Sequence, residues 1–148
     1  MLIGEFTHTL DEKSRLSLPS KFRSEMGKSV VVAPGIDGCL FVFAAREWKK
    51  FTERLSRPDS SSSVLQSDNR NFNRLIIGRA VETQIDSIGR ILIPEHLCSH
   101  ASLENKAVLL GLINRVEIWN ADVWDKHRKS FEKKTEVMAE KLNSAGII

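Results

Sequence analysis

Two segments of this chain place an aspartate four residues before an arginine and a proline four residues after it. They are Asp11-Glu12-Lys13-Ser14-Arg15-Leu16-Ser17-Leu18-Pro19 and Asp86-Ser87-Ile88-Gly89-Arg90-Ile91-Leu92-Ile93-Pro94. An Asp side chain readily accepts hydrogen bonds from the backbone that follows it and so builds a turn. The guanidinium of Arg suits bidentate contact with a carboxylate, a phosphate or the edge of guanine. The pattern therefore predicts anion or base-edge binding beside a tight turn.

These segments belong to a longer internal repeat. Their Asp, Arg and Pro recur at an offset of 75 residues. A second pair of segments follows in the same order at an offset of 76 residues: Leu40-Phe41-Val42-Phe43 with Trp48, and Val116-Glu117-Ile118-Trp119 with Trp124. Matching blocks at nearly constant spacing indicate one unit duplicated in tandem. The duplication predicts a pseudo-two-fold molecule, and DNA-binding proteins often use two-fold symmetry.

Two interpretations of the Asp-x-x-x-Arg turns compete. In the structural one, each Asp builds its turn and the Arg pairs with it at the surface, which is worth about 0.2–1 kcal/mol. However, no hydrophobic core requires an outward Arg at the same hairpin position twice. The repetition therefore favours Arg15 and Arg90 as nucleic-acid contacts, with Asp11 and Asp86 forming the turns that orient them.

The two turns differ at their tips. The first carries Lys13, a flexible cation suited to phosphate, where the second carries Ile88. Ile88 could touch a thymine methyl, a neighbouring subunit or the core. Gly89 adopts a positive φ without cost, whereas Ser14 at the matching place would cost roughly 1 kcal/mol or form another turn. We expect the first repeat to be the stronger DNA-binding element.

Hydrophobic periodicity predicts the elements that carry these turns, in the order β-β-α-β-β for each repeat. In the first repeat, strands are expected over 2–10, 15–18, 30–33 and 39–43, with a short helix over 20–26. In the second, strands are expected over 80–85, 90–93, 107–110 and 115–119, with a short helix after Pro94.

Further helices and the domain limits complete the prediction. A helix over 46–55 trails the first repeat, and one with Phe72, Leu75, Ile76 and Arg79 leads into the second. A single last helix, from 122 to about 142, places Trp124, Phe131 and Met138 on one narrow seam. The expected domains are repeat one (1–56), a Ser-rich connection (57–66), repeat two (67–120) and a C-terminal helix (121–148). The fold class is α+β and rich in β-strands.

Composition limits the class of protein. The chain has 148 residues, of which 41% are hydrophobic and 28% charged, as in an ordinary globular protein. The net charge is only +3, but the stretch 11–23 is basic, with Lys13, Arg15, Lys21 and Arg23. The start of the chain lacks the apolar core of a signal peptide, and no apolar run approaches the roughly 18 residues of a membrane helix. We therefore expect a cytoplasmic protein.

Motifs for catalysis or metal binding are missing from the sequence. It contains no nucleophile motif, phosphate loop or dinucleotide fingerprint. His96 and His100 are spaced to share a helix face, but Leu97 stands where a metalloprotease helix has Glu. Cys39 and Cys98 are too few for a disulfide framework. We expect no enzyme activity, no metal and no cofactor.

A wider set of residues carries a family resemblance that covers positions 2 to about 124. The set comprises Gly4-Glu5-Phe6-x-His8-x-Leu10-Asp11-x-Lys13-x-Arg15-Leu16-x-Leu18-Pro19-x-Lys21-Phe22-Arg23, Asp37-Gly38-Cys39-Leu40, Glu47-Trp48 and Asp86-x-x-Gly89-Arg90-Ile91-Leu92-Ile93-Pro94. Together they resemble the MraZ family of bacterial transcriptional regulators. The family usually has Gly where this chain has Ser14.

The resemblance implies both a fold and a function. It implies two tandem AbrB-like (SpoVT-AbrB) domains of the swapped-hairpin type, forming a barrel, and ring-shaped oligomers that bind repeated promoter boxes of the division and cell-wall gene cluster. It implies DNA contacts by Arg15 and Arg90, with Lys13 assisting. Lys21 and Arg23 also match the family pattern, as DNA contacts or as part of a subunit interface.

We therefore expect a sequence-specific repressor that acts as a homo-oligomer on double-stranded DNA and is associated with the nucleoid. Two other functions remain open. One is an antitoxin-like module that binds both DNA and a partner toxin. The other is a structural oligomer in which the Arg turns bind neighbouring subunits.

Overall fold

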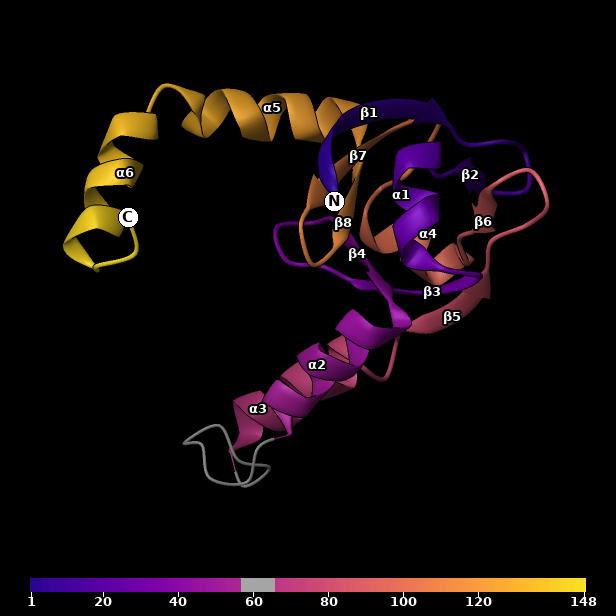
Figure 1. Ribbon diagram of the computed structural model, residues 1–148, viewed down its shortest axis with the longest axis horizontal. Coiled ribbons are helices and arrows are strands. Elements are labelled where there is room, and N and C mark those ends of the chain that lie inside the picture. Colours follow the sequence, from indigo (N-terminus) through magenta and orange to yellow (C-terminus); the bar gives the residue numbers. More distant parts are fainter. Residues whose placement is uncertain (57–65) are drawn as a thin grey trace.

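Both repeats have the predicted order of elements in the computed structural model, which describes residues 1–56 and 66–148 (Figure 1). The strands are β1 (Ile3–Thr9), β2 (Arg15–Ser17), β3 (Ser29–Pro34), β4 (Leu40–Ala44), β5 (Val81–Gln84), β6 (Arg90–Leu92), β7 (Lys106–Leu112) and β8 (Val116–Asn120). The helices are α1 (Ser20–Met26), α2 (Ala45–Leu55), α3 (Ser67–Ile76), α4 (Glu95–His100), α5 (Ala121–Glu132) and α6 (Thr135–Ser144). The α+β class is confirmed.

The short helices α1 and α4 begin in the same way. Each follows a proline, Pro19 or Pro94, whose φ of −52° or −60° suits the entry to a helix. The proline carbonyls accept the first backbone bonds, from Phe22 N at 2.9 Å and from Leu97 N at 3.0 Å. Gly27, with φ of 83°, ends α1 as its sequence position predicts.

The two repeats exchange strands. The six-stranded antiparallel sheet has the order β1-β7-β8-β4-β3-β5. The first strand of each repeat therefore pairs with the third strand of the other: β1 with β7, and β5 with β3 (Figure 1). A separate two-stranded ribbon joins β2 to β6. Neither repeat completes its own sheet, so the two share one AbrB-like swapped-hairpin barrel.

Strand pairing shows the pseudo-two-fold axis directly. Phe41 of β4 pairs with Glu117 of β8, and Leu16 of β2 pairs with Ile91 of β6. Each of these pairs joins equivalent positions of the two repeats, which is possible only on the axis itself. The predicted internal symmetry is therefore present.

Reciprocal hydrogen bonds lock the two Asp-x-x-x-Arg hairpins together. Leu18 N donates to Gly89 O at 2.9 Å, and Ile93 N donates to Ser14 O at 3.0 Å. The two bonds are equivalents of each other under the pseudo-two-fold symmetry. They place the tips of both hairpins on one side of the molecule.

The core lies between the sheet, the β2–β6 ribbon and helices α1 and α4. Phe22 of α1 and Leu97 of α4, which are equivalent residues, are both fully buried in it. Burying such a side chain is worth about 1.5–3 kcal/mol. Each repeat contributes comparably; the largest fully buried side chains are Phe22, Leu16, Leu40, Ile91, Ile93, Leu97, Leu109, Ile118, Val30, Val32, Val42 and Val116.

A second apolar cluster covers the other face of the sheet and holds the longer helices. Phe43 stacks on Phe51 of α2 with ring centroids 5.0 Å apart, and Trp119 lies 5.3 Å from Trp124 of α5. Glu117 is buried in this face, where it accepts a bond from Trp119 Nε1 at 3.0 Å. These contacts attach α2 and α5 through their first two turns, and both helices project from the body (Figure 1).

The prediction of one continuous C-terminal helix is wrong. The chain forms α5 and α6 with a break at 133–134, and Figure 1 shows α6 turning away from the line of α5. At the break, Thr135 Oγ1 donates to Glu132 O at 2.7 Å, and such a side-chain bond competes with the helical backbone bonds. No described residue of α6 is buried, so packing does not restore the helix. The expected seam therefore ends before Met138.

Two smaller expectations also need adjustment. Arg79 was expected on the helix that leads into repeat two, but α3 ends at Ile76, and Arg79 lies in the turn that follows. The expected Ser-rich connection over 57–66 lies outside the described residues except for its last residue, Gln66.

Candidate nucleic-acid interface

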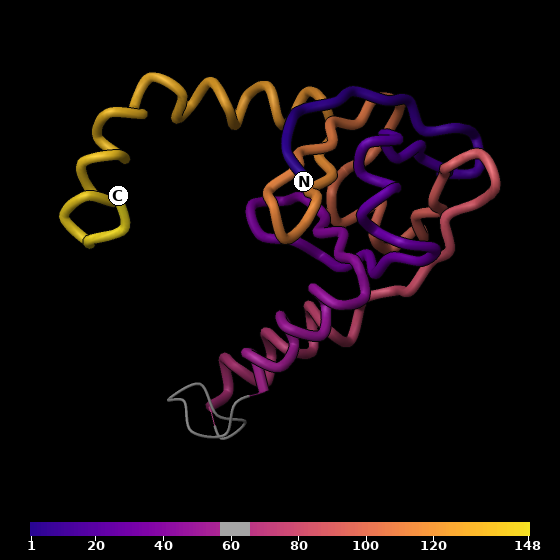
Figure 2. Tube along the Cα trace, viewed as in Figure 1, coloured from indigo at the N-terminus to yellow at the C-terminus, as the bar shows by residue number. Residues whose placement is uncertain are grey.

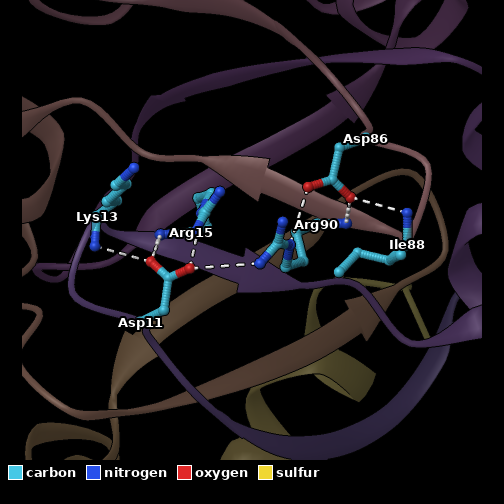
Figure 3. A network of polar contacts seen from close by, with 6 residues as sticks. All are labelled: Asp11, Lys13, Arg15, Asp86, Ile88 and Arg90. Atoms are coloured by element: carbon cyan, nitrogen blue, oxygen red, sulfur yellow. Dashed lines mark hydrogen bonds and ion pairs between the residues drawn. The ribbon is translucent and has the colours of Figure 1, made fainter.

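The first Asp-x-x-x-Arg turn is organised around the carboxylate of Asp11 (Figure 3). Asp11 Oδ1 accepts bonds from the backbone N–H groups of Lys13 and Arg15, both at 2.9 Å. Asp11 Oδ2 accepts the side-chain Nε of Arg15 at 2.7 Å. The backbone N–H of Arg15, followed by its side chain, lowers the pKa of Asp11 because these donors favour the charged carboxylate.

The second turn repeats this arrangement bond for bond. Asp86 Oδ1 accepts the backbone N–H groups of Ile88 at 3.1 Å and Arg90 at 2.8 Å. Asp86 Oδ2 accepts Arg90 Nε at 2.9 Å. The pKa of Asp86 is lowered for the same reason, first by the Arg90 backbone N–H. Each Asp therefore builds its turn and fixes the direction of its own Arg.

Ser14 adopts the same backbone conformation as Gly89. Their φ angles are 58° and 86°. Ser14 N donates to Asp11 O, and Gly89 N donates to Asp86 O, both at 3.0 Å. Ser14 could either adopt a strained positive φ or form another type of turn. The structure shows the first: Ser14 is left-handed and the turn is unchanged.

The structure brings the two arginines together. Ribbon pairing sets Ser17 opposite Arg90 and Arg15 opposite Leu92, so the hairpins lie next to each other (Figure 2). Arg90 Nη1 lies 3.5 Å from Asp11 Oδ2, which links the repeats. The side chains of Arg15 and Arg90 are 35% and 25% exposed. The guanidinium groups are thus accessible, neighbouring and held by carboxylates.

Of the other basic residues predicted to bind DNA, two are exposed at the surface and one packs against the second hairpin. Lys13 and Lys21 are exposed, and the Lys13 side chain extends away from Asp11 (Figure 3). Arg23 of α1 instead lies against the tip of the second hairpin, where its guanidinium occupies the space in which a Gly89 side chain would begin. Sequence reasoning missed this contact, because it assigned Gly89 to backbone conformation alone.

Ile88 is 63% exposed at the second tip. Of the three possibilities given above for this side chain, packing in the core is excluded. Contact with DNA and contact with a neighbouring subunit both remain.

The two histidines of α4 do not converge on a common point. His96 Nε2 lies 2.9 Å from Arg79 O, and His100 Nε2 lies 3.2 Å from Gly35 O. Across residues 1–56 and 66–148, no group of three or more His, Cys, Asp or Glu side chains could hold a metal ion. The histidines tie α4 to neighbouring backbone.

Comparison with known proteins establishes the family. The model of the family described as "MraZ protein, putative antitoxin-like" matches residues 1–73 and 76–142. The chain belongs to the MraZ family. The resemblance drawn from the sequence motifs is therefore confirmed.

Curated relatives match along nearly the whole chain. A protein of Caldanaerobacter subterraneus subsp. tengcongensis is 41% identical over 147 residues, 99% of this chain and 100% of the relative. One from Pediococcus pentosaceus is 42% identical with the same coverage. One from Limosilactobacillus reuteri is 42% identical over 143 residues, 97% and 98% of the two chains. All three are named "Transcriptional regulator MraZ", a function that is not enzymatic. No helix in the described part of the chain is long and apolar enough to cross a membrane.

Proposed function

We propose that this chain is a sequence-specific DNA-binding transcriptional regulator that acts as a repressor. The observation that carries the proposal is the pair of adjacent hairpins, each presenting an Arg whose direction is fixed by its own Asp. Arg pairs bidentately with guanine O6 and N7 or with phosphate, and the major groove of DNA admits a two-stranded β-ribbon. Membership of a family whose relatives are named as transcriptional regulators supports the same conclusion.

The basic residues have different roles in this proposal. Arg15 and Arg90 contact base edges or phosphates, and Lys13 adds a phosphate contact from the first tip. Lys21 contacts the backbone of the duplex or a neighbouring subunit. Arg23 acts from its place on Gly89, where it supports the second hairpin. Asp11 and Asp86 orient the arginines.

One copy makes few phosphate contacts, so we infer that several copies act together. A homo-oligomeric ring facing regularly spaced boxes makes every contact after the first intramolecular. Such avidity can raise affinity on the order of 10²–10⁴-fold. The targets are the repeated promoter boxes of the division and cell-wall gene cluster, and the protein works in the cytoplasm at the nucleoid.

Removal of the arginines tests the proposal. Arg15→Ala and Arg90→Ala should each weaken binding to promoter DNA by about 1–3 kcal/mol, and the double variant should bind promoter DNA more weakly than either single variant. Arg46→Ala, an exposed Arg on α2, is the matched control and should bind normally. Fluorescence anisotropy at fixed salt measures binding, and circular dichroism checks the fold. Full promoter binding by the folded double variant would refute the assignment of these residues.

The spacing of the boxes tests the oligomer. Inserting half a helical turn between two boxes should weaken binding, because the second box then faces away from the ring. Inserting a full turn should restore most of it. Affinity that is indifferent to both insertions would mean that the copies bind independently.

An antitoxin-like function is the second candidate, because the description of the family includes it. Residues 121–132 and 135–144 form the helices α5 and α6, whereas the partner-binding segment of such modules commonly folds only on binding. Co-purification of a small toxic protein with this chain would favour the antitoxin. A chain that oligomerises but ignores DNA at every salt concentration would favour a purely structural oligomer.

A further inference from the structure

One carboxylate contacts both arginines. Asp11 Oδ2 accepts Arg15 Nε at 2.7 Å and lies 3.5 Å from Arg90 Nη1 (Figure 3). Asp11 Oδ1 is held by the backbone N–H groups of Lys13 and Arg15, each at 2.9 Å. The carboxylate cannot swing away without undoing its own turn. Asp11 therefore joins the two guanidinium groups from a fixed position.

This link breaks the pseudo-two-fold symmetry. Asp86 holds Arg90 and its own turn as Asp11 holds Arg15, so the bonds within each hairpin are equivalent. Among the described residues, however, no ion pair joins Asp86 to Arg15, and only one of two symmetry-related links forms. Arg90 is accordingly bound to both carboxylates, and Arg15 to one.

We propose that Asp11 is a positioning residue for DNA binding, which fixes Arg90 relative to Arg15 so that both meet the duplex as one unit. This inference deepens the proposed function and rests on it. Side chains that are held in advance lose less freedom on binding, which raises affinity for the sequence they fit. Because ion pairs near the surface contribute little to folding, the effect of Asp11 falls on DNA binding rather than on stability.

Asp11→Asn and Asp86→Asn form a matched pair of variants. Each removes one negative charge, and the amide oxygen can still accept the backbone bonds of the turn. General attraction to phosphate therefore rises equally in both. The full-length wild type and the variants are titrated, at one salt concentration, against a duplex of native promoter boxes and a shuffled duplex of the same composition. The measured quantity is the ratio of the two affinities.

We expect Asp11→Asn to lower this ratio at least about fivefold more than Asp86→Asn does, with little change in either melting temperature. Equal ratios in the two variants overturn the positioning role and leave the proposed function intact. A wild-type chain that binds both duplexes alike overturns the proposed function, and this inference with it.

A double-mutant cycle between the two arginines tests the link a second way. We expect the loss of promoter binding in Arg15→Ala/Arg90→Ala to differ from the product of the two single losses by about threefold or more. In an Asp11→Ser background, whose hydroxyl can still accept the backbone bonds, the losses should multiply. If the two single losses of affinity simply multiply in the wild-type background, the inference is overturned, even if the Asp11 variants fail to fold.

Discussion

At the residue scale, Ser14 and Gly89 occupy the same left-handed position under different constraints. Ser14 has φ of 58°, which costs a residue with a Cβ roughly 1 kcal/mol. Gly89 has φ of 86° and must also leave room for Arg23. Position 89 therefore requires glycine for two reasons, the positive φ and the space that Arg23 occupies, whereas position 14 has only the first. This difference makes exchange of the two residues informative.

Ser14→Gly should be neutral or raise stability by up to about 1 kcal/mol, because it relieves the strain of the positive φ. Gly89→Ser should lower stability by about 1–2 kcal/mol, since the new Cβ also displaces Arg23. Thermal unfolding measures both effects. Adding Arg23→Ala should recover part of the loss in Gly89→Ser. A clear drop in melting temperature for Ser14→Gly would contradict the observed turn.

At the element scale, the exchange of strands makes each repeat dependent on the other. In the intact chain β1 pairs with β7, β2 with β6, β3 with β5 and β4 with β8, so all four strands in repeat one have partners in repeat two. Helix α1 likewise covers a core to which both repeats contribute. One repeat on its own therefore cannot bury the apolar faces of its strands.

A fragment of residues 1–56 should therefore not fold as a monomer. We expect it to be unfolded, or to form dimers in which a second copy supplies the missing strands. Mixing it with a fragment of residues 66–148 should restore the strand signal and a cooperative melt. Circular dichroism and light scattering measure these outcomes. A monomeric 1–56 fragment with its own cooperative transition would show that the shared sheet is not required.

At the scale of the whole molecule, the C-terminal arm consists of α5 and α6 and extends from the body (Figure 1). The apolar side chains of α6 are left uncovered. Helix α5 is attached through Trp124 and His127, which pack on Trp119. Beyond the break, Val137 and Met138 are 52% and 38% exposed. An exposed apolar helix face commonly marks a contact with another protein. In the proposed homo-oligomer, the neighbouring copy is the natural occupant of this face.

Deletion of residues 133–148 should leave the melting temperature of the body within a few degrees of the wild type, because no described residue of α6 is buried. The deletion should lower the mass of the oligomer in light scattering at equal protein concentration. It should also remove the sensitivity of DNA binding to box spacing. An unchanged mass would place the subunit interface elsewhere.

The sequence alone predicted most of the local structure, for reasons that are local. Alternating apolar residues, Pro19 before α1 and Gly27 after it sufficed for element types and limits. The repeated Asp11 and Asp86 turns sufficed to select Arg15 and Arg90. The C-terminal helix was mispredicted, since periodicity does not register the competing bond of Thr135 or the absence of packing around α6. The roles of the site residues in binding DNA stay predictions.

Duplication, turn chemistry and hydrophobic period each depend on residues that are close together in the sequence. The sequence by itself therefore determined two equivalent hairpins, each with an Arg after its turn. Only the tertiary structure decided which strands pair, because backbone hydrogen bonds do not distinguish a strand of one repeat from its equivalent in the other. The same is true of the contact of Arg23 with Gly89 and the link from Asp11 to Arg90. Both join residues far apart in the chain, and folding of the two repeats around one axis brings them within reach.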